Sequence, residues 1–410
     1  MKAWKRKIVC ALLATVTATL YSSTDAWAAE TQLPILMYHN LTVDGETNSM
    51  TITQERFRED MRYLAAYGYT PLLAADLVDI RAGVEAMPEK PVMITFDDGY
   101  ESNYTLAFPI LEETGMKATV ALITSHIRDD TGGGMPNSMT WQQAKEMYES
   151  GIVDIGTHTN RLHNEDNNGF EIPGGPDGIQ RRKDEGWMDY QTRVNQDIGA
   201  SIRMIQEKIG DTVRVLYFSY PFGATDPWFG QILLNNGLLV STTTQARTAD
   251  IGNGLYGLPR FRVTMDLPVS KLLQRSVTAN PTQSALELDG KSMTLPTYQI
   301  DGSNYVKLRD VADLVNGTAS QFSVGWDNGA VILRRGTAYE PDGSELRPLA
   351  GGGRTAESMA GPLLADGTPV VLEAYRINGN YYFKLRSLGE TVGFAVDWNE
   401  NDHILIIKTT

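Results

Sequence analysis

The sequence VMITFDDGY, at residues 92–100, runs from an apolar segment directly into two adjacent carboxylates and a glycine. Neighbouring side chains on a strand point to opposite sides, so one of Asp97 and Asp98 would enter the core unpaired if both lay within the strand. We therefore expect both at the end of the strand, where Gly99 permits a tight turn and both side chains reach one cavity. Two carboxylates so close repel each other, and a bound metal ion would leave one of them ionised as a base.

Strand-like and helix-like segments alternate around this strand, from Pro34 to about Val277. Short β-rich runs predict strands at residues 35–39, 92–96, 118–123, 152–157, 213–220 and 237–243. Helices are indicated after Thr53, after the capping-box sequence TWQQ (140–143) and over residues 191–209. This order predicts an α/β fold with a parallel sheet, open or closed into a barrel. In both architectures functional residues gather at the carboxyl ends of the strands.

The N-terminus has the pattern of a secretory signal peptide. Basic residues within positions 2–7 precede an apolar stretch at 8–20, and Ala26-Trp27-Ala28 offers a cleavage site, so residues 1–28 are predicted to be removed. An uncleaved anchor is the alternative, which the short apolar stretch disfavours. We therefore expect a secreted or cell-surface protein with no membrane span after cleavage.

Composition narrows the classes of protein and partner. The 410 residues carry a formal net charge of -14, which argues against nucleic acid and anionic lipid as partners. The single cysteine, Cys10, lies in the predicted signal peptide, so disulfides do not hold the mature chain together. The length predicts two or three domains.

Two histidines follow another predicted strand. His158 and His163 lie in GTHTNRLHN, in a chain with 5 histidines in all. A spacing of five residues places side chains about 140° apart on a helix, so this pair needs a loop to converge on one ion. Together with Asp98 they form a set of two imidazoles and one carboxylate, which is typical of open catalytic metal sites. Two loop histidines alone would be ordinary surface residues, but their occurrence with the Asp-Asp-Gly turn favours a metal site.

A long polar segment at residues 164–190 interrupts the alternation of strands and helices. It is rich in glycine and contains Phe170, Trp187 and Tyr190. Loops of this length inside compact domains are functional or disordered. The wall of a substrate groove and an unstructured insert are both open interpretations.

An internal repeat marks the C-terminal part of the chain. YQIDGSNYVKLRDVA (298–312) and YRINGNYYFKLRSLG (375–389) share tyrosine, isoleucine, glycine and KLR at matched positions. Each is followed by a strand–turn–strand pattern with hairpin signals. We predict a small β-rich α+β repeat module over residues 285–410.

Three motifs resemble those of the polysaccharide deacetylase family, carbohydrate esterase family 4. They are the long run from VMITFDDGY to ATVALI (92–123), GTHTNRLH (156–163) and FSYPFGA (218–224). The resemblance covers residues 32–279 and implies a distorted, incomplete (β/α) barrel. It also implies a metal-dependent hydrolase, acting on carbon–nitrogen bonds other than peptide bonds, that removes acetyl groups from glycans. The expected metal is one Zn²⁺, with Co²⁺ or Ni²⁺ as alternatives.

The resemblance assigns a role to several residues. It implies that Asp97 is the general base, that Asp98, His158 and His163 bind the metal, and that the backbone N–H of Phe222 stabilises the oxyanion. These roles suit amide hydrolysis, which needs an activated water, a Lewis acid and a proton donor for the leaving amine.

The motifs depart from the family pattern in three ways. The histidines are five apart, as in the subgroup that resembles biofilm poly-N-acetylglucosamine deacetylases, whereas many members space them four apart. The arginine that commonly precedes the proline of the third motif is absent, and Arg260 in LPRFRV is a candidate replacement that would orient Asp97. No leucine–histidine motif supplies the general acid. His39, at the end of the first predicted strand, is the candidate for that role, while His126 and His403 are interpreted as loop and surface residues.

The C-terminal repeats resemble the module called copper amine oxidase N-terminal-like. Copper is not expected, because a copper site needs clustered imidazoles and this region contains only His403. Strand alternation places Tyr305, Lys307 and Arg309 on one face, which is interpreted as a solvated surface or, alternatively, as a glycan- or wall-binding face. The module is therefore expected to associate with the cell wall or to act as a spacer.

The leading hypothesis is a secreted deacetylase of polymers that contain N-acetylglucosamine, either an exopolysaccharide or peptidoglycan. An O-acetyl esterase acting on xylan or a related polymer is the first alternative. The second is a catalytically inactive protein that binds cell-wall glycans, which the intact set of Asp97, Asp98, His158 and His163 disfavours.

Overall fold

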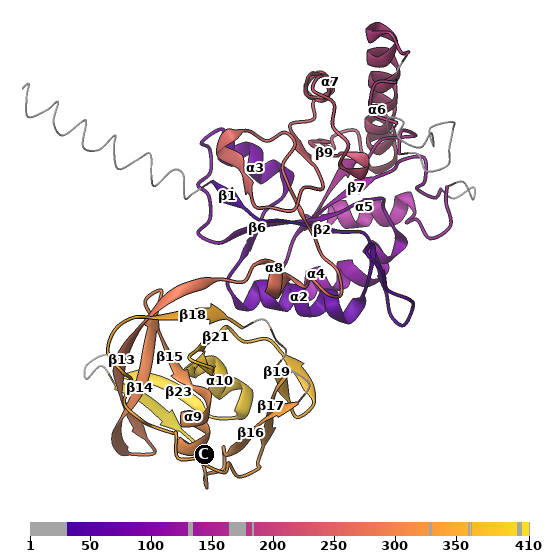
Figure 1. Cartoon of the computed structure of the whole chain (residues 1–410). Helices are drawn as coiled ribbons and strands as arrows, with labels where there is room; N and C mark the ends of the chain where they lie inside the picture. Colours follow the sequence, from indigo (N-terminus) through magenta and orange to yellow (C-terminus); the bar gives the residue numbers. More distant parts are fainter. Residues whose placement is uncertain are drawn as a thin grey trace, which may run out of the picture. The chain divides into compact units, whose positions relative to one another are not determined.

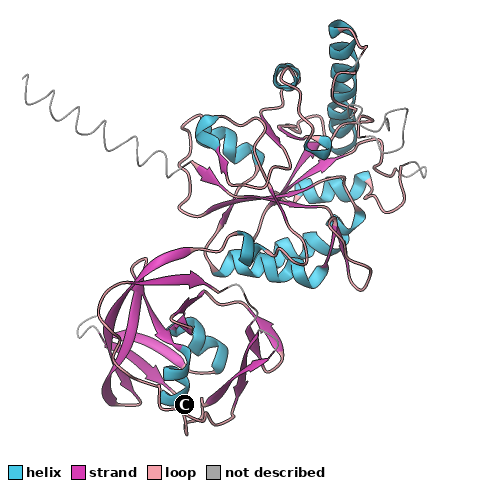
Figure 2. Cartoon of the chain, in the orientation of Figure 1, coloured by secondary structure: helices cyan, strands magenta, loops and turns pink. Residues whose placement is uncertain are grey.

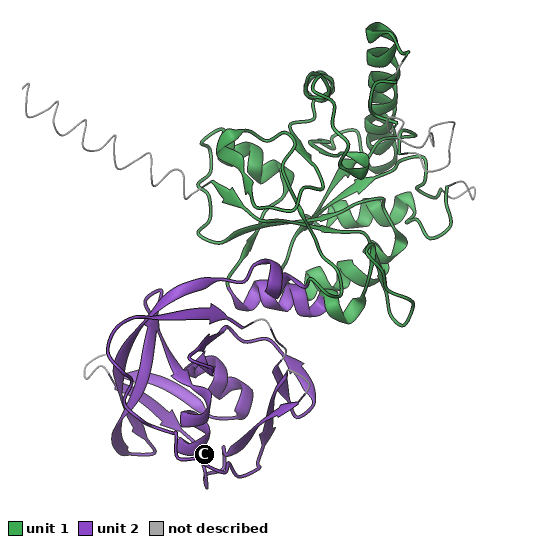
Figure 3. Ribbon diagram, in the orientation of Figure 1, with its two compact units in different colours: residues 1–57, 68–267 green, residues 58–67, 268–410 purple. Residues whose placement is uncertain are grey.

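The computed structural model describes residues 31–129, 134–163, 178–182, 184–327, 330–359, 361, 363–399 and 404–409. The predicted signal peptide, Phe170 and His403 lie outside these residues. Within the described part of the chain, no helix combines the length and apolar character needed to cross a membrane. Two compact units emerge, residues 1–57 with 68–267 and residues 58–67 with 268–410 (Figure 3).

A parallel, curled sheet forms the centre of the first unit (Figures 1 and 2). Its strands are, in spatial order, β10 (Val240–Thr242), β9 (Tyr217–Ser219), β8 (Val153–Thr157), β7 (Ala118–Leu122), β6 (Pro91–Phe96), β2 (Ile35–Tyr38) and β12 (Phe261–Arg262), and β5 (Thr70–Pro71) also pairs with β6. Every residue of β2, β6, β7 and β8 is buried, as expected for strands covered on both faces. The prediction of an α/β half-barrel is confirmed.

Helices connect these strands and cover the sheet. They are α3 (Ala74–Arg81), a π-helical turn (Asn103–Ala107), α4 (Phe108–Thr114), α5 (Trp141–Glu149), α6 (Trp187–Ile209), α7 (Phe229–Asn235) and a 3₁₀ turn (Ile251–Asn253). Helix α2 (Gln54–Ala66) begins in the first unit, but its residues from 58 onward belong to the second. The predicted capping box is present, because Thr140 Oγ1 accepts the Gln143 N–H and Gln143 Oε1 accepts the Thr140 N–H. Short pairs β1 (Gln32–Leu33) with β11 (Ala249–Asp250) and β3 (Asn40–Thr42) with β4 (Thr51–Thr53) complete the unit.

The second unit is rich in β-structure, as predicted. Its larger sheet contains β13 (Ser276–Leu288), β14 (Lys291–Ile300), β15 (Ser303–Lys307), β18 (Arg354–Ser358), β21 (Ala374–Ile377), β22 (Asn380–Lys384), β23 (Ala395–Asn399) and β24 (Ile404–Lys408). Its smaller sheet contains β16 (Phe322–Asp327), β17 (Ala330–Arg335), β19 (Leu363–Ala365) and β20 (Thr368–Val370). The helices are α8 (Val269–Leu272), α9 (Leu308–Leu314) and α10 (Leu385–Val392). The continuous strand β13 runs through residues 279–285, where we expected the boundary between domains.

The interpretation of one strand face as solvated is wrong. Tyr305 is only 2% exposed and lies in a tyrosine-rich core cluster, and Lys307 is buried with its ammonium bonded to Ser344. Leu308 begins α9, so Arg309 lies on a helix and not on the strand. The strand alternation therefore ends at Lys307, and Tyr305 stabilises the core and is not available to a glycan.

Candidate active site

The turn after β6 brings the two adjacent carboxylates to the carboxyl edge of the sheet. Asp98 and Gly99 both have positive φ, of 75° and 81°. A Cβ added at Gly99 would lie 2.8 Å from a carbon of Ile127 and 2.9 Å from one of Leu122, so glycine suits both the conformation and the space. The turn directs Asp97 and Asp98 into one cavity, as the sequence predicts.

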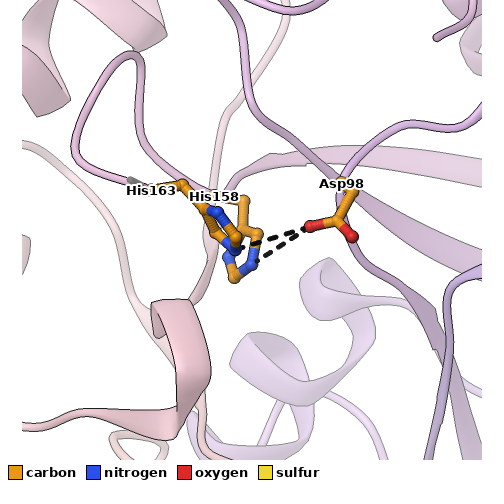
Figure 4. Close-up of side chains that lie close together, drawn as sticks. All are labelled: Asp98, His158 and His163. Carbon is orange, nitrogen blue, oxygen red and sulfur yellow. Dashed lines mark ion pairs between the residues drawn. The ribbon is translucent and has the colours of Figure 1, made fainter. Parts of the chain in front are cut away.

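Asp98, His158 and His163 form a cluster with the dimensions of a metal site (Figure 4). The Nε2 atoms of both histidines lie 3.6 Å from Asp98 Oδ1. A tetrahedral ion with ligands at about 2.1 Å separates its donor atoms by about 3.4 Å, so the three side chains fit one ion with little movement. His158 Nδ1 lies 2.7 Å from the carbonyl oxygen of Ser219, to which it must donate, and this leaves Nε2 free to coordinate a metal.

Burial keeps both imidazoles in the form that binds metal. Loss of solvent lowers the pKa of His158, and it lowers the pKa of His163 to about 2. Both rings are therefore neutral at pH 7. Metal binding does not have to displace a proton from either ring.

A buried arginine, Arg260, holds the carboxylate of Asp97 in place. Arg260 donates from Nη1 to Asp97 Oδ1 at 2.9 Å and from Nη2 to Oδ2 at 2.7 Å, while Ser219 Oγ donates to Oδ2 at 3.0 Å. Arg260 is fixed in turn, because its Nε donates to the carbonyl oxygen of Thr243 at 2.9 Å. Burial by itself raises the pKa of Asp97, but the charge of Arg260 outweighs it and holds the pKa well below the usual range. Asp97 is therefore a charged carboxylate with a fixed orientation.

A cavity of about 480 Å³ joins these groups to His39 and Phe222. His39 follows β2 and is 7% exposed, and burial lowers its pKa to about 4. Phe222 adopts a φ of 56° in the 3₁₀ turn Pro221–Gly223, and its ring lies 4.5 Å from that of His163. Within the described part of the chain, the backbone N–H of Phe222 makes no hydrogen bond. Every predicted site residue except Arg260 lines the cavity. Arg260 does not line it but donates two hydrogen bonds to Asp97, which does.

Two residues at the site have roles that the sequence reasoning missed. His126 lies in the loop after β7, as expected, but it is half-buried and lines the cavity, which was not expected. Its position shortly after β7 is the signal that could have placed it at the same edge of the sheet. Ser219 occupies one of the positions before Pro221 where an arginine was expected, and it bonds both Asp97 and Arg260.

Comparisons with known proteins agree with this geometry. Residues 85–240 match the polysaccharide deacetylase family. YxkH of Bacillus subtilis, a presumptive polysaccharide deacetylase, is 29% identical over 244 residues, covering 59% of this chain and 76% of that protein. The poly-β-1,6-N-acetyl-D-glucosamine N-deacetylase of Staphylococcus epidermidis is 25% identical over 222 residues, covering 54% of this chain and 71% of that enzyme. The structure of a de-N-acetylase from Aggregatibacter actinomycetemcomitans matches with a TM-score of 0.50 and 23% identity, covering 59% of this chain and 98% of that one, which shows a shared fold.

Proposed function

Because this chain belongs to the polysaccharide deacetylase family and is a hydrolase of that kind, we propose that it removes N-acetyl groups from polymers of N-acetylglucosamine. The observation that carries the proposal is the cavity in which a charged Asp97 lies beside a ligand set of one carboxylate and two neutral imidazoles. A binding protein has no need for a buried carboxylate beside a metal site. The names of the relatives and the five-residue spacing of the histidines support the substrate class.

We propose that Asp98, His158 and His163 hold one divalent ion, with Zn²⁺ expected and Co²⁺ or Ni²⁺ as alternatives. Such an ion, when bound, would lower the pKa of a water molecule and polarise the acetyl carbonyl. Asp97, which Arg260 and Ser219 hold charged and oriented, takes a proton from the attacking water.

We assign the remaining steps to His39 and Phe222. The N–H of Phe222 stabilises the negative oxygen that forms on the carbonyl carbon. His39 is neutral at rest because its pKa is about 4, so it must receive a proton before it can donate one. Protonated Asp97 is a strong acid and can supply that proton, and His39 passes it to the leaving amine.

Acetate release tests the substrate class. Full-length protein is incubated with chitooligosaccharides, with β-1,6-linked N-acetylglucosamine oligomers, with peptidoglycan and with O-acetylated xylan. Release from at least one N-acetylated glycan, and little from xylan, is expected. Release from xylan alone would establish the O-acetyl esterase, and release from none would favour the inactive glycan-binding protein.

Asp97→Asn separates catalysis from metal binding in the same assay. We expect a loss of about 10²- to 10⁴-fold in turnover with the metal still bound, because the base is removed and the three ligands stay. His163→Ala is the matched variant that should lose the metal as well. Unchanged turnover in Asp97→Asn would remove Asp97 as the base.

We also propose that the protein is exported and works at or outside the cell surface. The signal-like N-terminus and the polymeric substrates named for its relatives support this localisation.

A further inference from the structure

The second compact unit contains a cavity of about 570 Å³ that has no residue in common with the metal cluster. Its walls come from both sequence repeats. Trp326, on β16, belongs to the first repeat, whereas Arg376 on β21 and Tyr381 on β22 belong to the second. The cavity therefore exists only because the two repeats pack together.

A stacked aromatic pair forms one side of this cavity. The rings of Trp326 and Tyr381 lie 5.5 Å apart with an angle of 22° between their planes. Tyr381 packs against the hydrophobic core, while Trp326 is 57% exposed. Tyr381 therefore stacks against the indole of Trp326, and much of the indole stays exposed to solvent. A large exposed aromatic surface of this kind favours a ligand with a flat apolar face.

Polar and charged side chains surround the aromatic pair. Arg309 forms an ion pair with Asp342, and Lys307 lies 3.5 Å from Asp310. Arg376 also lines the cavity, and within the described part of the chain its guanidinium has no ion-pair or hydrogen-bond partner. A free guanidinium binds carboxylates through two parallel hydrogen bonds.

We propose that this cavity binds a sugar chain that carries acidic groups, with one ring stacked on the Trp326–Tyr381 pair and a carboxylate held by Arg376. A pyranose ring has one apolar C–H face and hydroxyl groups around its edge, which matches an aromatic platform with a polar rim. The acidic group follows from Arg376, whose charged side chain lines the cavity beside the aromatic pair. The site lies outside the catalytic machinery and would retain the protein on a polymer.

The second repeat supplies a matched control. Trp398 occupies the position on β23 that corresponds to Trp326 on β16, and each pairs with an apolar residue on the next strand, Leu405 and Val331 respectively. Trp398 is 47% exposed, but it does not line the cavity. Its removal therefore matches the loss of an exposed indole without touching the proposed site.

Sedimentation with purified peptidoglycan sacculi, which carry acidic groups, tests the site in the full-length chain. We expect Trp326→Ala to bind about tenfold more weakly, Trp326→Phe to retain most of the binding, and Trp398→Ala to bind like the wild type. Arg376→Gln should weaken binding to sacculi and reduce its salt dependence, but should leave binding to neutral chitohexaose unchanged. Wild-type binding by Trp326→Ala, or an equal loss in Trp398→Ala, would overturn the proposal.

Acetate release from a short soluble oligosaccharide separates this inference from the proposed function. The Trp326 variants should keep wild-type turnover on that substrate, because the residue lies in the other compact unit. Their thermal unfolding should match that of the wild type, which shows that lost binding does not reflect lost folding. A chain that binds sacculi through Trp326 but releases no acetate would contradict the proposed function alone.

Discussion

The charge state of Asp97 depends on an arginine that lies far away in the sequence. Arg260 is separated from Asp97 by 163 positions, is fully buried, and makes two hydrogen bonds to its carboxylate. Removing one partner of a buried ion pair leaves an uncompensated charge, at a cost of about 3–5 kcal/mol. Replacing Arg260 by a small neutral residue would therefore destabilise the fold. A conservative substitution tests the effect of Arg260 on Asp97 without that loss.

Arg260→Lys should lower turnover by about 10- to 100-fold with little change in KM, because lysine keeps the charge but cannot hold both carboxylate oxygens. Arg260 lowers the pKa of Asp97, so a weaker contact should raise that pKa. The wild type should show no acid limb from Asp97 above pH 4, because its pKa lies well below the usual range, whereas Arg260→Lys should lose turnover as the pH falls toward 4. Full kcat profiles from pH 4 to 9 check this, with the exposed Arg247→Lys as the control. A variant profile with the same shape as the wild type would remove Arg260 from the control of Asp97.

His39→Gln should reduce turnover by about 10²-fold or more and leave substrate affinity within a few-fold, because the proposed role is proton transfer and not binding. Burial lowers the pKa of His39 to about 4, so its neutral form persists as the pH falls from 8 to 5. The pH–rate profile of the wild type should therefore have no inflection near pH 6.5 that is due to His39. The profiles of the wild type and of His39→Gln should have the same shape in that region. Wild-type turnover in His39→Gln would send the search for the acid to His126, which lines the same cavity.

The sequence predicted the residues whose position depends on a local motif. Asp98, His158 and His163 each follow a buried strand of the parallel sheet, so their convergence at its carboxyl edge could be inferred. Arg260 was only a candidate, because it precedes the two-residue strand β12 and its contact with Asp97 depends on how the sheet curls. His126 was missed because a lone loop histidine carries no periodic pattern.

At the scale of elements, the two halves of the chain differ in how well sequence periodicity predicted them. Strands β2, β6, β7 and β8 of the first unit are continuous buried runs, and their predicted positions agree with the structure within one residue at each end. The strand predicted at 213–220 is shorter, since β9 covers only Tyr217–Ser219. In the second unit, the alternation YVKLR was extended too far. Leu308, Val311, Ala312 and Val315 have helical spacing and are buried, and their burial against the core decides in favour of α9.

Asp154, near the start of strand β8, should lower the free energy of unfolding above neutral pH, where its carboxyl is charged. Asp154 is 9% exposed, and burial raises its pKa to about 6. A carboxyl whose pKa is higher in the folded state stabilises that state below the unfolded pKa of 3.8 and loses this contribution as the pH rises through 6. Asp154→Asn should therefore stabilise the protein by about 3 kcal/mol at pH 8 and have little effect at pH 4.

Urea unfolding at both pH values checks this prediction. The amide oxygen of the introduced asparagine could still accept the N–H of Ile155, which lies 3.1 Å from Asp154 Oδ1 in the wild type. The exposed Asp44→Asn, in the loop between β3 and β4, is the control for the loss of a negative charge. An equal gain at pH 4 and pH 8 would contradict the titration of Asp154.

At the scale of the whole molecule, the chemistry and the second cavity are divided between the two units. All three proposed metal ligands belong to the first unit, and every residue of the Trp326 cavity belongs to the second. A ligand that binds only the native state stabilises the unit that holds it. We therefore predict that a metal ion raises the unfolding temperature of the first unit, and that a ligand of the Trp326 cavity raises that of the second.

Calorimetry of the full-length chain, with and without chelator, measures this directly. At a free Zn²⁺ concentration of about one hundred times its Kd, the first unit should gain about 2.7 kcal/mol, while the transition of the second unit stays where it is. His163→Ala should abolish the gain, because it removes one of the three ligands and leaves the second unit untouched. If both transitions moved together, or if His163→Ala kept the full shift, the ion would bind outside the cluster of Asp98, His158 and His163.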